Sequence, residues 1–384
     1  MAGQFKCVAI IGPRQSGKTT LARMTFGDRA YTNMEDPDTR EFAATDPRRF
    51  LAQYPNGAVI DEIQRVPALF SYLQGILDNI SEPGRFVLTG SQHFGLMSRI
   101  SQSLAGRVGF VKLLPFSLSE LTSAETPNPN LETQLFKGGY PPIYDLDASP
   151  EWWLNAYIAS YIERDMRQLI IVHDIGVFQR FMRMCAANVG QLLNMTRMGS
   201  DLGIDQKTVR AWMGILETSF ILFRLMPHHA NFRKRLVKTP KLYFYDTGLA
   251  VRLLGIEASE QLVTHSMRGP LFENWVIGEL LKHRYNQGKE SNLFFWRNNT
   301  GHEVDIIADL GDALQPIEVK SGLTIANDWF ESVLRWRALA KGRSRKPCIV
   351  YGGADEQKRE QIDIVPWRSI ASLAERLAIP VSMS

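Results

Sequence analysis

Cysteine is scarce in this chain of 384 residues: only Cys7, Cys185 and Cys348 occur, and they lie far apart. This spacing excludes a disulfide framework and a cysteine-ligated zinc site, because both need characteristic cysteine spacings. Chains without disulfides are typical of reducing compartments, so we expect a cytoplasmic protein.

Long apolar runs are absent as well. The stretch 220–226 is among the longest, yet it carries Arg224 and is far shorter than the ~20 residues that cross a bilayer. The first few residues lead directly into an apolar strand, which is not the pattern of a signal peptide. We therefore expect neither a membrane segment nor a membrane partner.

An excess of one charge is also missing, since 44 Lys and Arg residues stand against 40 Asp and Glu residues. The net charge of +4 permits contact with nucleic acid but does not demand it. His228, His265 and His302 are scattered and form no zinc motif, and no serine or cysteine nucleophile motif occurs. The length corresponds to two or three domains.

A phosphate-binding loop is the most informative feature that is present. An apolar run ends at Ile11, and the sequence Gly-Pro-Arg-Gln-Ser-Gly-Lys-Thr follows it. In such a loop the glycines let main-chain N–H groups point at phosphate oxygens, the lysine reaches the β- and γ-phosphates, and the threonine binds Mg²⁺. A glycine-rich turn without a nucleotide is the alternative. We expect ATP and Mg²⁺ to be held by Gly12, Pro13, Arg14, Gln15, Ser16, Gly17, Lys18, Thr19 and Thr20.

A second apolar run, 57–60, ends in Asp61 and Glu62. In a parallel sheet this strand would place both carboxylates beside the phosphate loop. We expect Asp61 to help hold Mg²⁺, and Glu62 and Lys18 to be catalytic, with Glu62 polarising the attacking water. Two solvated charges at the end of a strand are the alternative.

Two further candidates follow the next apolar strand. Ser91, or Thr89, is placed to sense the γ-phosphate or to orient the water, and a polar turn is the alternative. Arg107 follows the flexible Gly106 and is a candidate arginine finger for the nucleotide of a neighbouring subunit. That role predicts a homo-oligomer, whereas an ordinary surface arginine does not.

The middle of the chain, 151–226, is mainly helical in its pattern. Around Gly203 the sequence is typical of a helix-turn-helix, with Asp205 as the cap of the second helix. Lys207 and Arg210 would then face a duplex groove, and the basic segment 231–238 would form a wing on the phosphates. DNA is therefore a candidate partner, and packing between domains is the alternative.

The C-terminal part contains strand patterns at 293–297, 303–307 and 315–320. The dipeptide Gly311-Asp312 is typical of a hairpin turn. This turn predicts a register in which Asp305 faces Glu318 and Glu303 faces Lys320.

Like charges that face each other in a sheet need a cation between them. We expect a divalent metal, Mg²⁺ or Mn²⁺, held by Asp305, Glu318 and Glu273, with Lys320 as a catalytic residue that steers a water. Glu273 would lie near the start of an amphipathic helix at 272–281. An ion pair between Glu303 and Lys320, with Asp305 solvated, is the alternative.

Taken in order, these motifs resemble those of a family of bacterial and archaeal AAA-type ATPases that carry a C-terminal domain of uncharacterised function. The resemblance extends over nearly the whole chain. The segments that carry it are 12–20, 58–62, 88–91, 104–107, 114–117 with Glu120, 138–141, 161–165 and 241–249. The order of Glu273, Asp305 and Glu318-Val-Lys320 is similar to that of the PD-(D/E)XK nuclease fold, which implies a metal-dependent site for nucleic acid.

We therefore predict an α/β protein of three domains. These are a P-loop AAA-type ATPase domain with a parallel sheet at 1–125, a helical and winged-helix-like region at 126–245, and an α/β, restriction-endonuclease-like domain at 246–384. ATP hydrolysis would reposition the other two domains on DNA. Two alternatives stay open: a nucleotide-switched binding module that does not cut, and a metal-dependent DNase regulated by ATP.

Overall fold

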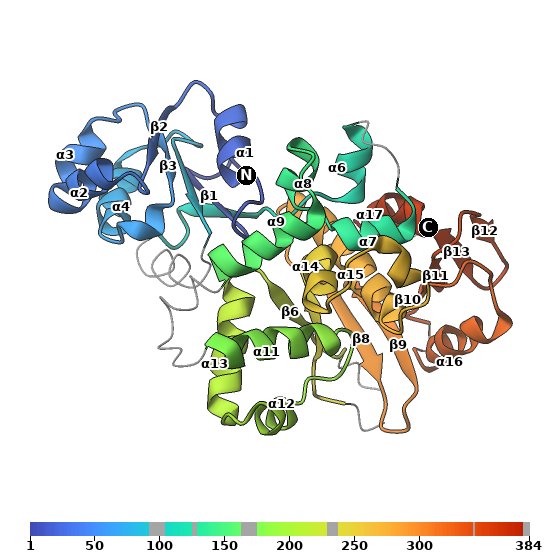
Figure 1. Cartoon of the computed structure of the whole chain (residues 1–384). Helices are drawn as coiled ribbons and strands as arrows, with labels where there is room; N and C mark the ends of the chain where they lie inside the picture. Colours follow the sequence, from blue (N-terminus) through green and yellow to red (C-terminus); the bar gives the residue numbers. More distant parts are fainter. Residues whose placement is uncertain (92–103, 125–128, 163–174, 229–236, 341, 379–384) are drawn as a thin grey trace. The chain divides into compact units, whose positions relative to one another are not determined.

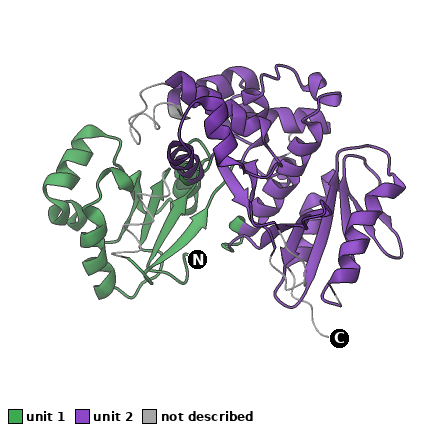
Figure 2. Cartoon of the chain, turned by 90° about the horizontal axis from the view of Figure 1, so that it is seen from below, with its two compact units in different colours: residues 1–115, 218–220, 285–289 green, residues 116–217, 221–284, 290–384 purple. Residues whose placement is uncertain are grey.

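The computed structural model describes residues 1–91, 104–124, 129–162, 175–228, 237–340 and 342–378. Packing divides the chain into two compact units, shown in Figure 2: unit 1 contains residues 1–115, 218–220 and 285–289, and unit 2 contains the remainder. The division into three domains stays a prediction. In the described part of the chain, no helix has both the length and the apolar character needed to span a membrane.

Unit 1 is built on a five-stranded sheet in the order β2-β3-β4-β1-β5, and every pairing in it is parallel. Its strands are β1 (Cys7–Ile11), β2 (Ala30–Asn33), β3 (Ala58–Asp61), β4 (Phe86–Gly90) and β5 (Val108–Lys112). β1, β3 and β4 are buried along their whole length, as expected for strands covered on both faces. Because the strands are parallel, their carboxyl ends meet at one edge, which is where β1 and β3 deliver the predicted site residues.

The helices of unit 1 begin at recognisable sequence signals. These helices are α1 (Lys18–Thr25), α2 (Pro37–Thr45), α3 (Pro47–Ala52), the short η1 (Ile63–Arg65) and α4 (Leu69–Asn79). In α2 and α3 a proline occupies the first position, and the preceding Asp36 or Asp46 accepts an N–H from the first turn. Leu69, Phe70, Leu73 and Leu77 form the buried face of α4.

Unit 2 begins with helices, as the sequence predicts for this region. Figure 1 labels α6 (Leu118–Ser123), α7 (Leu131–Lys137), α8 (Pro141–Asp145), α9 (Pro150–Tyr157), α11 (Ile175–Ala187), α12 (Met195–Leu202), α13 (Gln206–Thr218), α14 (Thr247–Leu253) and α15 (Arg268–Asn286). Two shorter helical elements are the π-helical η2 (Ile158–Ile162) and η3 (Ser259–Val263). Between α12 and α13 the chain turns at Gly203, which has a φ of 71°. Asp205 caps α13 by accepting the N–H of Thr208 at 2.6 Å, so the expected helix, turn and helix are all present.

An antiparallel pair of strands, β6 (Leu222–Leu225) and β7 (Lys241–Phe244), follows α13. Of the basic segment that was expected to form a wing, residues 231–236 lie outside the described residues. The part of the family motif at 163–165 also lies outside them.

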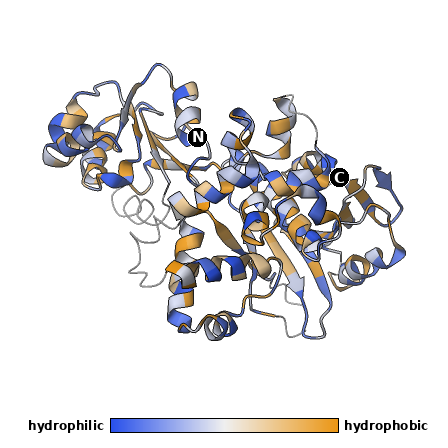
Figure 3. Ribbon diagram, in the orientation of Figure 1, coloured by the Kyte–Doolittle hydropathy of each residue, from blue (hydrophilic) through white to orange (hydrophobic). Residues whose placement is uncertain are grey.

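The second sheet of unit 2 is mixed and has the order β12-β13-β11-β10-β9-β8. Its elements are β8 (Leu293–Arg297), β9 (Glu303–Asp309), β10 (Leu314–Lys320), η4 (Asn327–Phe330), α16 (Glu331–Leu339), β11 (Cys348–Tyr351), β12 (Gln357–Lys358), β13 (Asp363–Pro366), η5 (Trp367–Ser369) and α17 (Ile370–Ala378). β8, β9 and β10 are antiparallel neighbours, whereas β10, β11 and β13 run parallel. Figure 3 shows apolar colour along these strands and a hydrophilic tip on the β9–β10 hairpin.

The predicted hairpin register is confirmed. Ile306 pairs with Ile317 and Asp309 pairs with Leu314, around a turn in which Gly311 has a φ of 88°. The next step along both strands brings Asp305 to Glu318, as the sequence predicts.

The helix that was expected to be amphipathic is buried on nearly all sides. It extends over Arg268–Asn286, and residues 271–282 are buried except for the partly buried Glu273; most positions nearer its ends are partly buried, and Asn286 is exposed. Because it lies in the interior of unit 2, no solvent-facing stripe is needed. Its polar residues are satisfied inside the protein: Asn274, for example, bonds the main chain of Phe244 through both its oxygen and its nitrogen.

Candidate functional site

The loop between β1 and α1 is shaped for a close approach of the main chain to a ligand. A Cβ atom on Gly12 would lie 2.0 Å from the carbonyl oxygen of Leu113, and Gly17 has a φ of 87°, so both positions require glycine. Ser16 is 3% exposed, and its Oγ has no hydrogen-bond partner among the described residues. A buried hydroxyl in need of a partner and a glycine-lined loop fit a phosphate group.

Lys18 is the first residue of α1 and is only 6% exposed. Its Nζ donates to the carbonyl oxygen of Pro13 at 2.6 Å. Burial lowers the pKa of Lys18 to about 8, although the nearby Glu62 and Asp61 favour its charged form. A bound polyphosphate would place negative charge next to the ammonium group of Lys18 and would stabilise its charged form.

Asp61 lies at the end of β3 and accepts hydrogen bonds from three hydroxyl groups. Thr19 Oγ1 and Tyr31 OH each donate to its Oδ2 at 2.8 Å, and Thr89 Oγ1 donates to its Oδ1. Burial and the bond to Asp61 raise the pKa of Tyr31, so its hydroxyl stays a donor. The two predicted Mg²⁺ ligands, Thr19 and Asp61, are therefore in contact.

Glu62 follows in a left-handed conformation, with a φ of 51°. Its N–H donates to Thr89 Oγ1 at 3.3 Å, and its Oε2 accepts from Ser91 Oγ at 3.2 Å. Gln64 also donates to this oxygen, a contact that the sequence analysis missed. Three residues thus orient Glu62 at the edge of the sheet.

The other predicted residues of unit 1 surround this centre. Arg14 is partly buried, and Gln15 and Thr20 are exposed. Arg107 is ion-paired with Asp78 of the same unit, and its side chain is 31% exposed. Its action on a neighbouring subunit stays a prediction.

The second group of predicted residues comes together in unit 2. Glu273 comes from α15, Asp305 from β9, and Glu318 and Lys320 from β10. Asp305 Oδ2 accepts the main-chain N–H of Val319 at 2.9 Å. Lys320 Nζ donates to Glu318 Oε1 at 2.8 Å, while Glu318 Oε2 has no partner among the described residues.

Lys241, the first residue of β7, is the member of this group that the sequence analysis missed. It is 3% exposed, and its Nζ lies 3.0 Å from Glu273 Oε1 and in contact with Glu303 Oε1. Tyr243, two residues further on the same face of β7, donates its hydroxyl to Glu273. The alternation of Lys241 and Tyr243 in the conspicuous segment 241–246 is the signal that could have revealed them.

The alternative ion pair between Glu303 and Lys320 is not formed. Glu303 contacts Lys241 and, at 2.9 Å, Arg297 Nη1, which faces it on β8. Lys320 instead contacts its own strand neighbour Glu318. In this cluster the register of β9 and β10 does not decide which residues form ion pairs. The β6–β7 pair brings in a further ammonium group, that of Lys241, which binds Glu303.

Burial dominates the electrostatics of the cluster. It raises the pKa of Glu273 to about 7 against the opposing effect of Lys241, and that of Glu318 to about 8, with Asp305 adding to the rise. Burial alone would lower the pKa of Lys241, but Glu273, Asp305 and Glu303 hold it above its ordinary value. The ammonium therefore stays charged.

The donor set was tested for a divalent metal. In the parts of the chain that the structure describes, no three His, Cys, Asp or Glu side chains are grouped closely enough to hold a metal ion together. One oxygen each of Glu273, Glu303 and Glu318 binds a lysine ammonium group, whereas Glu318 Oε2 has no partner among the described residues. As arranged, these residues do not fit a divalent cation.

The same motif segment contributes a structural contact through Asp246. This buried carboxylate accepts N–H groups from Gly139 at 2.7 Å and from Leu249 at 3.1 Å. A Cβ atom on Gly138 would lie 2.2 Å from Asp246 Oδ1. The two family motifs at 138–141 and 241–249 therefore meet here and fix the start of α14.

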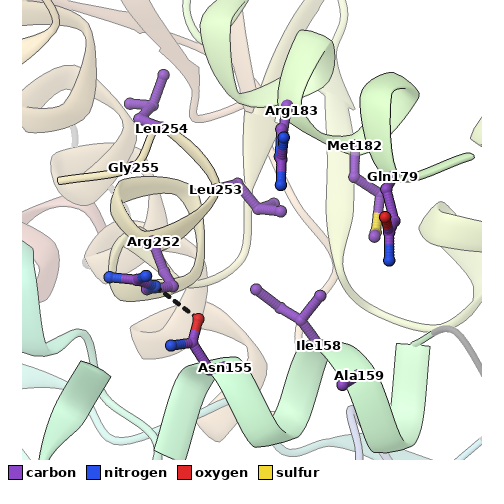
Figure 4. Close-up of a pocket in the computed structure, with 10 residues that line it drawn as sticks. All are labelled: Asn155, Ile158, Ala159, Gln179, Met182, Arg183, Arg252, Leu253, Leu254 and Gly255. Carbon is purple, nitrogen blue, oxygen red and sulfur yellow. Dashed lines mark hydrogen bonds between the residues drawn. The ribbon is translucent and has the colours of Figure 1, made fainter. Parts of the chain in front are cut away.

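A separate pocket of about 510 Å³ lies between η2, α11 and the end of α14 (Figure 4). Ile158, Met182 and Leu253 supply apolar walls, and Arg252 Nε donates to Asn155 Oδ1 at 2.6 Å. No sequence motif predicts this pocket, and none of the predicted site residues lines it.

Comparisons with known proteins agree with the geometry of unit 1. Residues 4–122 match the family model of an AAA domain, and residues 128–260 and 268–370 match two domains of unknown function, DUF8612 and DUF4143. The uncharacterised proteins Rv2008c of Mycobacterium tuberculosis and Mb2031c of Mycobacterium bovis are each 31% identical over 318 residues, which cover 82% of this chain and 70% of each relative. The structure of the Walker-type ATPase paby2304 of Pyrococcus abyssi aligns with 65% of this chain and 91% of that chain, at 14% identity and a TM-score of 0.42.

The match to an AAA domain, together with the phosphate loop and the parallel sheet, confirms the P-loop ATPase domain predicted at the N-terminus. The C-terminal match carries no assigned function, so the restriction-endonuclease-like domain stays a prediction.

Proposed function

We propose that this chain, which belongs to the same family as the mycobacterial proteins Rv2008c and Mb2031c, binds ATP with Mg²⁺ in unit 1 and hydrolyses it. The observation that carries the proposal is the bond of 2.8 Å between Thr19 and Asp61, with the buried Lys18 beside them. These are the groups that a triphosphate with its metal requires, at the edge where parallel strands end.

Each residue has a defined task in this proposal. Main-chain N–H groups of the loop and Lys18 would bind the phosphates, and Thr19 and Asp61 would hold Mg²⁺, which neutralises charge on the phosphates when bound. Ser91 and Gln64 orient Glu62, whose carboxylate would accept a hydrogen bond from the attacking water. Tyr31 and Thr89 fix the carboxylate of Asp61.

The test measures ATP binding and turnover in parallel. Lys18→Ala should lower turnover by about 100-fold or more, because one positioned charge is lost from the transition state. Glu62→Gln should retain ATP binding and lose turnover. Lys289→Ala and Glu41→Gln, on exposed residues of unit 1, are the matched controls. Turnover by Lys18→Ala at the rate of the unaltered protein would contradict the proposal.

Contact with duplex DNA is the second candidate, and the face of α13 supports it. Val209, Trp212, Met213 and Leu216 form the buried side of this helix. Lys207 and Arg210 are exposed on its other side, and the β6–β7 pair follows α13 along the chain, an order of elements that resembles a winged helix.

Binding of a labelled duplex at several salt concentrations tests this role. The double variant Lys207→Ala, Arg210→Ala should bind more weakly and show a salt slope about 2 units shallower, because two phosphate contacts are lost. Arg180→Ala, an exposed arginine of α11, is the control. An unchanged slope in the double variant would remove α13 from the DNA-binding surface.

Arg107 connects ATP turnover to assembly in this proposal. To reach the nucleotide of a second copy it must leave Asp78. Specific turnover should then rise with protein concentration, and Arg107→Ala should abolish that rise. Turnover that is independent of concentration in both proteins would leave Arg107 as a surface residue.

For the C-terminal sheet, the internal ion pairs favour binding of a partner without cleavage over a nuclease. Of the carboxylates that a metal-dependent nuclease would use, Glu273 and Glu318 each bind a lysine ammonium group through one oxygen. ATP turnover in unit 1 would then control how unit 2 binds a partner, and the partner would not be cleaved.

A further inference from the structure

The acidic cluster of unit 2 brings several carboxylates together in a largely buried place, where their negative charges repel one another. Four carboxylates, those of Glu273, Glu303, Asp305 and Glu318, converge from α15, β9 and β10. Glu318 is 5% exposed, so its carboxyl group is largely shielded from water. Buried carboxylates that lie together repel one another unless a cation is placed among them.

The cation that the structure provides is the ammonium group of Lys241. Its Nζ binds one oxygen of Glu273 and one of Glu303, and its field acts on Asp305 as well. The aromatic ring of Phe295 lies 5.5 Å from the same nitrogen and adds a cation–π contact. Lys241 thus has partners on α15, β8 and β9.

The main chain leaves this lysine little freedom to move away. Lys241 pairs with Leu225 in the β6–β7 ladder, and Leu193 donates its N–H to the neighbouring Pro240. Tyr243, on the same face of β7, binds the same oxygen of Glu273. The strand therefore delivers the ammonium to the carboxylates as a built part of the fold.

We propose that the ammonium of Lys241 takes the place of a divalent cation in this cluster. The C-terminal sheet of unit 2 then holds no metal and does not cleave phosphodiester bonds. The same ammonium ties the strand pair after α13 to α15 and β9, so the cluster is an ionic lock between the helix-turn-helix part and the sheet. This inference is independent of ATP hydrolysis in unit 1.

A divalent metal held by the predicted ligands would share the carboxylate of Glu273 with Lys241, whose positive charge also acts on Asp305. The lysine contributes one positive charge at the carboxylate oxygens, and a metal ion that bound them would lie against that charge. Removal of the ammonium should therefore create a metal site where the unaltered protein has none, because the acids are left without a counter-ion.

The test uses the full chain without nucleotide and MnCl₂ as the probe. Free Mn²⁺ is measured by electron paramagnetic resonance, and the melting temperature is measured with and without Mn²⁺. The unaltered protein should show no Mn²⁺ binding that depends on Asp305. Lys241→Ala should bind Mn²⁺ at least about tenfold more tightly than the unaltered protein and should be stabilised by it, and Asp305→Asn added to this variant should abolish both effects.

Lys320→Ala is the matched control, since it removes a lysine that is 33% exposed from the same cluster. Lys241→Arg, which keeps the positive charge, should behave like the unaltered protein. If Lys241→Ala does not fold without metal, Mn²⁺ should restore its melting transition. Mn²⁺ binding by the unaltered protein that Asp305→Asn removes would overturn the proposal, and so would a folded Lys241→Ala variant that binds no Mn²⁺.

Discussion

Unit 1 and unit 2 each hold a group of carboxylates on or beside a β-sheet, and the two groups bind different kinds of donors. Asp61 of unit 1 accepts hydrogen bonds from the hydroxyl groups of Thr19, Tyr31 and Thr89, and these donors carry no charge. Glu273 of unit 2 binds the ammonium of Lys241. A carboxylate that is bonded to hydroxyl groups still attracts a metal, whereas one that is bonded to an ammonium has already been compensated.

The comparison teaches that a count of acids does not predict a metal site. Lys18 of unit 1 is also a buried lysine near two acids, yet its Nζ is bonded to the carbonyl of Pro13. Its charge remains available for a ligand. The chemistry of each site therefore depends on which groups the lysine ammonium contacts. The path of the main chain determines these contacts.

The largest expected effect on ATP binding comes from Gly12, where the loop of unit 1 has no space for a side chain. Gly12→Ala should lower the affinity for ATP by roughly 100-fold, because a Cβ atom forces the loop away from Leu113 and misplaces its N–H groups. Titration with a fluorescent ATP analogue measures the change. Gly75→Ala, in α4 with open space around its Cβ position, should leave the affinity unchanged. An equal loss in both variants would contradict the steric argument.

The next effect sharpens the contrast between a buried and a half-exposed lysine in unit 2. Lys241→Ala should lower the free energy of unfolding by about 3–5 kcal/mol, because it leaves buried carboxylates unpaired. Lys320→Ala should cost less, about 1–3 kcal/mol, because its side chain is 33% exposed and water can take its place beside Glu318. Urea denaturation of both variants measures the difference, and similar losses would show that burial is not the deciding factor.

A smaller effect is expected in the dependence of stability on pH. Burial raises the pKa of Glu318 from 4.5 to about 8, so the folded chain holds a proton that the unfolded chain has released. Stability should therefore fall as the pH rises from about 5 to about 8. Glu318→Gln removes this titration and should gain about 1 kcal/mol or more over the unaltered protein at pH 8.

Urea denaturation at several pH values checks the last prediction, with the exposed Glu331→Gln as the control. Equal pH slopes for Glu318→Gln and the unaltered protein would mean that Glu318 is ionised in the folded state at pH 5.

Local sequence was sufficient for much of the fold. Gly12, Gly17 and the apolar strand before them specify the phosphate loop, because the glycines are required at those two positions by close approach and by a positive φ. The Gly311-Asp312 turn specifies the register of β9 and β10, since a two-residue turn leaves one pairing for the residues that follow. Asp205 and Gly203 specify the turn between α12 and α13 in the same local way.

The contacts that decide the chemistry of unit 2 were not predictable in this way. Lys241 is 32 residues from Glu273 and 62 from Glu303, and no spacing rule links a strand residue to acids so far along the chain. The burial of α15 is not visible in its sequence either, because the pattern of 272–281 indicates an amphipathic helix. Both depend on which elements pack together.

By itself, the sequence determined the short-range features of this protein: a loop that must be glycine, a turn that sets a register, and caps that start helices. These follow from steric and hydrogen-bonding limits within a few residues. Only the tertiary structure decided that hydroxyl groups surround Asp61 while an ammonium lies among Glu273 and Glu303. The reason is that electrostatic energy depends on distance and burial in space, which separation along the chain does not specify.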